Sequence, residues 1–598
     1  NATQDFDMKG DAEVVMQMNQ DGALIWKQMT GENIGKNVAI TLDGYVQSSP
    51  TVIGEIPGGR SSISMGSGDR NKQIEEATDL ANILKAGALP APARIIDETV
   101  VGPSLGAENI RQGLISFGVA MLLVMVFMIV YYNGSGWVAN VALLANVFIL
   151  MGTLASLQAS LTLPGIAGIV LTVGMAVDAN VLINERIREE LRHGKAIKTA
   201  IDLGYKHAMS AIIDANVTHI VAAIILIVFG TGPIKSFGVT LALGILTSLF
   251  TAIFISRLII SRRLEKGKTI SFSHSWNKDA FAHANYNFMS KRKTFYAVSA
   301  VVILAGFVSM FTRGFDQGVD FSGGRQYVVK FDAPVEVDQV RTALGEVYVE
   351  DGKQSSIGVK SYGGSNQVMV TTNYMVKSTD RSVDQLVEQK LGEGLKKLDH
   401  NFYIAASRKV DPTISDDIRS HAVWALVLAL LFMFAYIAVR FRTWQFGLGA
   451  LLSLAHDALI VVGLYSLLWG IMPFSMEIDE QFIAAVLTVI GYSINDTVVV
   501  FDRIREYLQD HKREPWRVVF NKAINSTLGR TINTSVTVLL VLLVIFLLGG
   551  ISIKGFVFAM LVGIAVGTYS SIFIASAVVV DLHKDTIPEP APTKPVAA

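Results

Sequence analysis

Long apolar stretches constrain the fold of this chain more than any other feature. A helix needs roughly 20 mostly apolar residues to cross a hydrocarbon core about 30 Å thick. Only 17% of the 598 residues are charged, whereas about 25% is usual in a soluble protein. Apolar stretches of spanning length occur eleven times, at residues 113–132, 137–158, 164–184, 208–229, 237–258, 294–312, 422–440, 446–470, 482–502, 526–548 and 555–580. The sequence therefore predicts a polytopic α-helical membrane protein with eleven spans.

The composition and the missing motifs exclude several functions. The 51 basic and 51 acidic side chains give zero net charge, so the chain lacks the basic surface that nucleic acid needs. It has no cysteine, which excludes disulfides, thiolate nucleophiles and cysteine metal sites. No GxxxxGKS/T or HExxH motif occurs, so nothing indicates nucleotide hydrolysis or zinc chemistry. We expect a protein that is not an enzyme, has no cofactor, and draws any work from an ion gradient, worth roughly 2.3 kcal/mol per charge per 100 mV.

Two segments are too polar to lie in the bilayer, residues 1–110 and about 315–420. Lysine and arginine are concentrated after the third span, in 257–293 and after the ninth span, which predicts that these three loops are cytoplasmic. Counting spans from them puts both polar domains on the extracytoplasmic side and the C-terminus in the cytoplasm. Because an odd number of spans also puts the N-terminus outside, we expect a twelfth helix upstream of Asn1.

The chain divides into seven predicted parts. The second polar domain shows a strand, a helix, two strands, a helix and a strand, at 325–332, 335–348, 356–361, 367–373, 380–397 and 402–410. This β-α-β-β-α-β order is typical of a ferredoxin-like α+β domain, and residues 10–90 give a similar but less regular pattern. The parts are a first extracytoplasmic domain (1–110), a helix bundle (111–262), a cytoplasmic linker (263–293), a single span (294–312), a second extracytoplasmic domain (313–420), a second bundle (421–582) and a cytoplasmic tail (583–598).

The membrane part is an internal repeat. A shift of 317 residues aligns GMAVDANVLINERIRE (174–189) with GYSINDTVVVFDRIRE (491–506), so that Asp178 meets Asn495 and the two RIRE segments coincide. The same shift aligns Asn216 with Asn533. Parallel repeats place their functional site between the two halves, which predicts a pseudo-twofold, transporter-like bundle.

Seven ionisable residues lie well inside the predicted spans. Each costs roughly 2.5–3.5 kcal/mol at the bilayer centre, so a bundle keeps such residues only when they are partnered or functional. They are Asp178, Asp214, His219, His456, Asp457, Asp496 and Arg530. Hydrogen bonding between helices alone would also explain them, and for the two histidines packing is the better reading.

The depth of these residues predicts a proton relay. Asp178 and Asp496 lie at nearly the same depth in the repeat, and Arg530 enters the next span from the same side. An arginine can hold an aspartate ionised, and protonation of that aspartate frees the pair. Asp457, and Asp214, which could instead bond Asn180 or Asn216, are further candidates for the relay. The RIRE segments are equally well explained as anchors at the membrane surface.

The longest motifs resemble a known family. The runs LKAGALPAPARIIDETVVGPSLG (84–106) and GMAVDANVLINERIREE (174–190) resemble SecD. The runs GVDFSGG (318–324), LAHDALIVVG (454–463), GYSINDTVVVFDRIRE (491–506) and LGRTINTSVTVLL (528–540) resemble SecF. In this order they resemble the fused SecDF family of the resistance-nodulation-division superfamily.

The resemblance implies a function. It implies a bacterial inner-membrane protein that uses the proton-motive force to help export unfolded preproteins with the SecYEG translocon, and that is in contact with membrane lipid. It also implies that Asp178, Asp496 and Arg530 belong to the proton path. Family members have a larger first domain with a protruding head, and residues 1–110 are expected to be only its membrane-proximal part. A proton-coupled exporter of small molecules or lipids, a passive scaffold, and Na⁺ as coupling ion remain alternatives.

Overall fold

The computed structural model describes residues 2–7, 10–42, 45–65, 70–86, 97–159, 162–281, 284–350, 353–376, 378 and 382–583. The chain separates into two compact units, residues 1–95 and 96–598.

The first unit is a small α+β domain. Strands β1 (Ala2–Phe6), β2 (Ala12–Gln17) and β5 (Arg60–Ser64) form an antiparallel sheet in the order β1-β2-β5. Its apolar side chains pack against helix α2 (Arg70–Ala86), and β2 alternates buried residues with less buried ones as a half-buried strand does. Helix α1 (Gln20–Glu32) and the hairpin of β3 (Ile40–Leu42) and β4 (Tyr45–Ser48) complete the unit. Its element order therefore differs from the β-α-β-β-α-β order that is predicted for the second polar domain.

The second unit contains eleven helices of spanning length among the residues that the structure describes, which confirms the predicted number. In the first half they are α3 (Pro103–Tyr132), α4 (Gly134–Ser156), α5 (Leu163–Ala176) continued by α6 (Asp178–Arg192), α7 (Ile197–Phe229), and α8 (Gly232–Phe250) continued by η1 (Thr251–Ile255) and α9 (Ser256–Glu265). In the second half they are α10 (Arg292–Thr312), α14 (Pro412–Phe441), α15 (Trp444–Leu468), α16 (Glu480–Asp510), α17 (Trp516–Leu548), and α18 (Ile551–Ser570) continued by η3 (Ser571–Ala575) and α19 (Ser576–Leu582).

Two helices form the centre of the bundle. In the most apolar stretch of each span, 94% of the residues are buried in α16 and 83% in the α5–α6 span. In the peripheral α10 the share of buried residues is only 17%. Helix α16 packs against α7 of the other half, and α17 packs against α3 and α5. The helices of the two repeats that contain most of the predicted ionisable residues therefore meet in the middle of the bundle.

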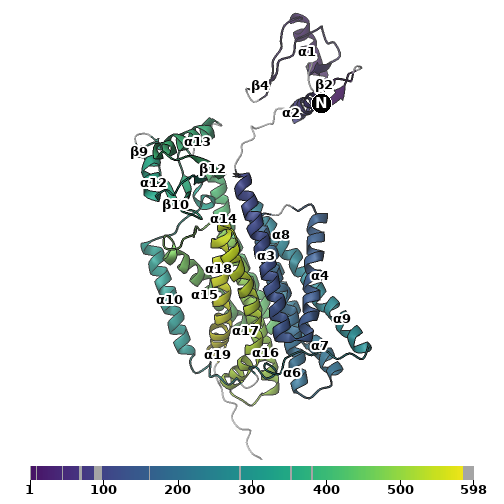
Figure 1. Ribbon diagram of the computed structural model, residues 1–598, viewed down its shortest axis with the longest axis vertical. Coiled ribbons are helices and arrows are strands. Elements are labelled where there is room, and N and C mark those ends of the chain that lie inside the picture. Colours follow the sequence, from purple (N-terminus) through teal and green to yellow (C-terminus); the bar gives the residue numbers. More distant parts are fainter. Residues whose placement is uncertain are drawn as a thin grey trace, which may run out of the picture. The chain divides into compact units, whose positions relative to one another are not determined.

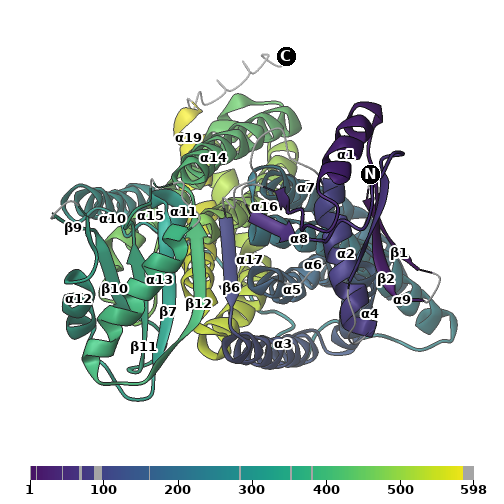
Figure 2. The same cartoon turned by 90° about the horizontal axis from the view of Figure 1, so that it is seen from above.

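A five-stranded antiparallel sheet lies at one end of the bundle (Figures 1 and 2). Its order is β10 (Ile357–Ser361), β11 (Gln367–Thr372), β7 (Gly324–Phe331), β12 (Phe402–Val410) and β6 (Asp97–Val101). Helices α12 (Val337–Gly345) and α13 (Ser382–Leu395) cover one face with a buried apolar core, and Figure 2 shows α13 lying across the strands. We call this end of the bundle the sheet end. The opposite end, where residues 266–291 connect α9 to α10, is the linker end.

The strand β6 departs from the expected domain boundaries. The sequence analysis assigns residues 1–110 to the first domain, but β6 pairs with β12 of the second domain over five residues, from Asp97–Val410 to Val101–Ala406. The partner of an edge strand is set by the tertiary fold, because its own pattern does not specify which neighbour it will pair with. Residues 97–101 thus connect the sheet directly to α3, which begins at Pro103.

Candidate functional site in the helix bundle

Three of the predicted relay residues line one small cavity between the two halves. Asp178, Asp496 and Arg530 surround a space of about 30 Å³ in the middle of the bundle. A buried water needs roughly 10–15 Å³ and two to four polar partners, so the space suits about two waters. Side chains from α5, α6, α7 and α8 of the first half and from α16 and α17 of the second half form its wall, which places the cavity at the repeat interface.

Asp178 is positioned by a break in the third span. The regular helix is interrupted at Val177, so Asp178 is the first residue of α6. Neither carboxylate oxygen of Asp178 has a hydrogen-bond partner among the described residues. The Asn495 Oδ1, which belongs to the aligned position of the second half, is likewise unpartnered there and lines the same cavity.

Asp496 has a different environment. Its side chain is 3% exposed, and its Oδ2 accepts hydrogen bonds from Ser535 Oγ at 3.3 Å and Thr568 Oγ1 at 3.5 Å. These two hydroxyls also bond each other at 2.7 Å. The two carboxylates of the cavity are therefore not equivalent: one is held by hydroxyl groups of α17 and α18, and the other has no donor in the described part of the chain.

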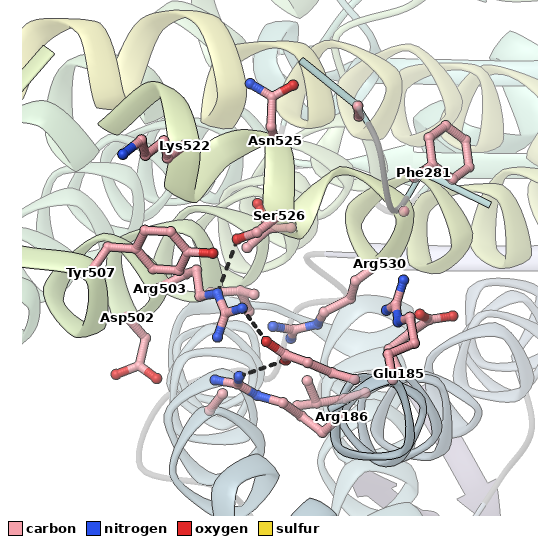
Figure 3. Close-up of a pocket in the computed structure, with 18 of the residues that line it drawn as sticks. Glu185, Arg186, Phe281, Asp502, Arg503, Tyr507, Lys522, Asn525, Ser526 and Arg530 are labelled. Atoms are coloured by element: carbon pink, nitrogen blue, oxygen red, sulfur yellow. Dashed lines mark hydrogen bonds and ion pairs between the residues drawn. The ribbon is translucent and has the colours of Figure 1, made fainter. Parts of the chain in front are cut away.

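Arg530 lies between this cavity and a second, larger one. The larger cavity of about 460 Å³ opens at the linker end and is lined by charged side chains of α6, α16 and α17 (Figure 3). We call it the vestibule. Arg530 lines both spaces, and among the described residues its guanidinium makes no ion pair within 4.0 Å. The sequence analysis expects an Arg–Asp ion pair; this structure instead brings the three residues to one cavity without closing that pair.

The linker forms one wall of the vestibule. Phe281 lies against Gly529, where a Cβ atom would be 3.2 Å from its ring. Asn525 and Asn521 of α17 hold the linker backbone: Asn525 Oδ1 accepts from Tyr286 N–H at 2.8 Å, and Asn521 Oδ1 accepts from Phe288 N–H at 2.8 Å. The sequence analysis did not single out these asparagines, although their spacing of four residues on one helix face is a readable signal.

Asp214 is not part of the cavity. Its carboxylate forms an ion pair with Arg440 of α14, with Nη2 to Oδ2 at 2.7 Å, and accepts a hydrogen bond from Tyr436 at 2.8 Å. The sequence analysis offered Asn180, Asn216 or the relay as partners, and the structure shows none of the three. Arg440 was missed because it lies at the very end of a predicted span, where a basic residue is ordinarily an anchor.

Asp457 belongs to a separate buried network. Its Oδ1 lies 2.9 Å from His456 Nδ1, and its Oδ2 accepts from Ser493 Oγ and from Ser570 Oγ at 2.7 Å. The other ring nitrogen of His456 lies 2.9 Å from Ser299 Oγ of α10. Asp457 therefore ties α10, α15, α16 and α18 together rather than facing Asp178. The second buried histidine, His219, does line the small cavity, and its Nε2 has no partner among the described residues.

The fold and the site define a class of protein. Two helix repeats enclose buried ionisable side chains at their interface, an architecture that is found among transporter-like membrane proteins. The family model "Protein export membrane protein SecD/SecF, C-terminal" matches residues 85–266 and 390–585, and the SecD/SecF GG motif matches 308–335. The chain belongs to the SecD/SecF family.

Relatives and solved structures match over nearly the whole chain. The protein translocase subunit SecDF of Thermus thermophilus is 38% identical over 96% of this chain and 75% of its own length. The same subunit of Brucella abortus is 33% identical over 96% of this chain and 73% of its own length. The crystal structure of Thermus thermophilus SecDF, a translocon-associated membrane protein, aligns with a TM-score of 0.76 at 36% identity, covering 97% of this chain and 77% of that one. SecDF in a super-membrane-facing form aligns with a TM-score of 0.63.

The first domain requires a correction. The sequence analysis predicts that residues 1–110 contain only the membrane-proximal part of this domain and that its head is absent. Residues 1–91 match the SecDF P1 head subdomain, so this prediction is wrong. The motifs that carry the resemblance begin at residue 84, where a long motif adjoins the first span, whereas the short strands of the head contain no motif of comparable length.

Proposed function

We propose that this protein is a proton-driven subunit of the protein-export machinery in the bacterial cytoplasmic membrane. It assists the SecYEG translocon by acting on unfolded preproteins at the extracytoplasmic side. Relatives named protein translocase subunit SecDF, which match 96% of this chain, support this assignment, as does the match of residues 1–91 to the head subdomain. The basic residues at the linker end support an orientation with that end in the cytoplasm and the sheet end outside; they include Arg192, Lys195, Arg262, Lys266, Arg505 and Lys512.

The proton relay consists of Asp178, Asp496 and Arg530. The observation that carries this proposal is the carboxylate of Asp178, which lines a water-sized cavity without any donor in the described part of the chain. A buried carboxylate without a hydrogen-bond donor has a high free energy as an anion. Protonation therefore stabilises Asp178 more than it stabilises Asp496. Arg530 then has two carboxylates to stabilise in turn, because it lines the same cavity. Protonation changes which carboxylate attracts Arg530, and this biases the position of one half relative to the other.

Protons are favoured over Na⁺ as the coupling ion. The unpartnered oxygens of Asp178 and Asn495 could in principle coordinate Na⁺, but Arg530 places a fixed positive charge at the same small cavity. A second cation there would be repelled, whereas a proton neutralises a carboxylate and frees the arginine. The space of about 30 Å³ is also too small for an organic molecule, so it offers no support for an exporter of small molecules or lipids.

The test replaces Asp178 with Asn, which has the same size but cannot ionise. In proteoliposomes that contain the translocon and an imposed proton gradient, we expect Asp178→Asn to lose the stimulation of preprotein export. Asp214→Asn is the matched control, because Asp214 is a buried carboxylate of the same half that is already paired with Arg440 outside the cavity. We expect it to keep the stimulation. Equal stimulation in wild type and Asp178→Asn would overturn the relay, and a response to Na⁺ at constant pH would overturn the choice of ion.

A further inference from the structure

The two RIRE segments form a charged cluster between the halves at the linker end. We call Arg186, Glu189, Arg503 and Glu506 the RIRE quartet. Within each helix the arginine pairs with the glutamate three residues later, with Arg186 Nη1 to Glu189 Oε2 at 2.9 Å and Arg503 Nη1 to Glu506 Oε2 at 2.8 Å. Across the halves, Arg186 Nη2 lies 3.1 Å from Glu506 Oε2, and Arg503 Nη2 pairs with Glu189 Oε1.

The quartet reproduces the repeat symmetry. Because Arg186 aligns with Arg503 and Glu189 with Glu506, the two cross pairs are equivalent under the pseudo-twofold relation. Each arginine divides its two terminal nitrogens between a partner on its own helix and a partner on the other half. If the halves move apart, every member therefore keeps one partner. Breaking a buried ion pair costs free energy mainly because it leaves a charge without a partner. Separation of the halves leaves no such charge here, so the closed arrangement is specific but can open.

The position of the quartet relates it to the relay. Arg186 lies eight residues beyond Asp178 on α6, and Arg503 lies seven residues beyond Asp496 on α16, which places the quartet about 10–12 Å nearer the linker end. Arg186, Glu189 and Arg503 line the vestibule together with Arg530, and Figure 3 shows Arg186, Arg503 and Arg530 around this cavity. The route from the linker end to Arg530 thus runs past the contact that joins α6 to α16.

We propose that the RIRE quartet is an inter-half lock that controls access from the linker end to the relay. Closed cross pairs hold α6 and α16 together below Arg530 and limit the vestibule to its present size. Their separation widens the vestibule and exposes Arg530 to water from that end. The inference rests on the proposed proton path, but the lock is tested by accessibility alone.

The repeat offers an exchange that isolates the cross pairs. The half swap, Arg186→Glu with Glu189→Arg, keeps the pair within α6 and the net charge, but it faces Glu with Glu and Arg with Arg across the halves. The complete swap adds Arg503→Glu and Glu506→Arg, which restores all four contacts with reversed polarity. Reporters are Leu182→Cys and Val499→Cys, one per half, because these aligned residues both line the vestibule and are each 4% exposed. Each would be the only thiol of a chain that has no cysteine.

The readout is the labelling rate with a membrane-impermeant maleimide applied from the linker end. We expect the half swap to increase the rate about tenfold at both reporters and the complete swap to return it to within about twofold of the original. An unchanged rate in the half swap would overturn the lock. An equal increase in both swaps would also overturn it, because the effect would then come from the residue types and not from the pairing.

Two further comparisons distinguish failure of the lock from misfolding of a variant and from failure of the proposed proton path. The opposite half swap, Arg503→Glu with Glu506→Arg, should increase labelling as the first does, and it replaces the first if that protein fails to fold. Export stimulation by the gradient is measured in the same proteoliposomes. If labelling follows the expected pattern while Asp178→Asn retains full stimulation, the lock stands and the proposed proton path fails. If Asp178→Asn loses stimulation while labelling ignores the swaps, the proton path stands and the lock fails.

Discussion

Asp479 is a titratable residue outside the spans whose pKa is strongly shifted by its surroundings. It precedes α16, and its Oδ1 accepts a hydrogen bond from Phe482 N–H at 2.8 Å as a helix cap. Burial, and then the negative charge of Asp320, raise its pKa from 3.8 to about 8, while the cap bond and Arg408 act in the opposite direction and Glu477 adds to the increase. Near neutral pH this side chain is therefore largely protonated in the folded protein.

The substitution Asp479→Asn should change how stability depends on pH. The folded protein holds a proton that the unfolded chain releases above about pH 4, so the wild type loses stability as pH rises and levels off only above about pH 8. Asparagine keeps the cap and does not titrate. We expect the thermal unfolding midpoint of the variant to exceed that of the wild type at pH 8.5, and the excess to shrink steadily toward pH 5. A constant difference across this range would show that Asp479 does not titrate there.

Single residues show what the sequence could and could not predict about the site. The sequence could predict that Asp178, Asp496 and Arg530 lie close together, because depth along a helix follows from counting residues and the repeat gives a second estimate of the same depth. The partners of Asp214 and Asp457 were not found, because Arg440 and Ser570 come from other helices whose packing is not encoded in the local pattern. A charged residue inside a predicted span therefore indicates that a partner exists, but not which residue the partner is.

At the scale of the element, the start of β7 depends on two glycines. Gly323 and Gly324 have φ of 67° and 123°, which side-chain-bearing residues rarely adopt, and a Cβ on Gly324 would be 2.7 Å from the Thr372 carbonyl oxygen. These glycines turn the chain from the short helix α11 (Val319–Ser322) into a central strand of the sheet. This explains the paired glycines of GVDFSGG as a backbone requirement.

Alanine substitutions at two glycines of this domain should have opposite effects. Gly324→Ala combines an unfavourable φ with a steric conflict, so we expect it to lower the free energy of unfolding by about 1–3 kcal/mol. Gly392→Ala is the matched control, because Gly392 lies within α13 and a Cβ there meets nothing within 4 Å. It should raise stability by roughly 0.5–1 kcal/mol. Denaturant unfolding of the full chain, followed by hydrogen exchange in β7 and α13, measures both, and a tolerated Gly324→Ala would contradict the argument.

Helices and strands were predicted well where a single physical property of the sequence determines their position. The eleven spans follow from apolar length, although α7 and α17 extend about ten residues beyond the predicted apolar stretches, because a helix need not end where the hydrocarbon does. The π-helical turns η1 and η3 were not predicted. They occur 320 residues apart in the last span of each half, and a local pattern gives no sign of such a turn. Their recurrence shows that the repeat extends to irregular features of the backbone.

At the scale of the whole molecule, one group of contacts joins the sheet to the centre of the bundle. Arg408 of β12 pairs with the fully buried Asp320, with Nη2 to Oδ1 at 2.7 Å. Asp320 Oδ2 accepts from the backbone N–H of Glu480 at 3.0 Å, and the Glu480 carboxylate accepts from Thr231 Oγ1 at 2.7 Å. The sheet is therefore connected to the first turn of α16, and α16 in turn to the loop between α7 and α8. Asp496 lies on the same unbroken helix, 16 residues or about 24 Å away.

This connection predicts that Arg408 transmits movement of α16 to the sheet. Arg408→Gln leaves Asp320 buried without its counter-ion, which should cost on the order of 3 kcal/mol of stability. Combining it with Asp320→Asn removes the second charge and should recover most of that loss. Proton-gradient stimulation of export should stay low in both variants, because neither restores the ion pair between Arg408 of β12 and Asp320, the residue that also bonds the first turn of α16. Lys397→Gln, which breaks the exposed pair with Glu346 on the same domain, is the control and should leave export unchanged. If the stable double variant regained full stimulation, the link would be structural support rather than the path of transmission.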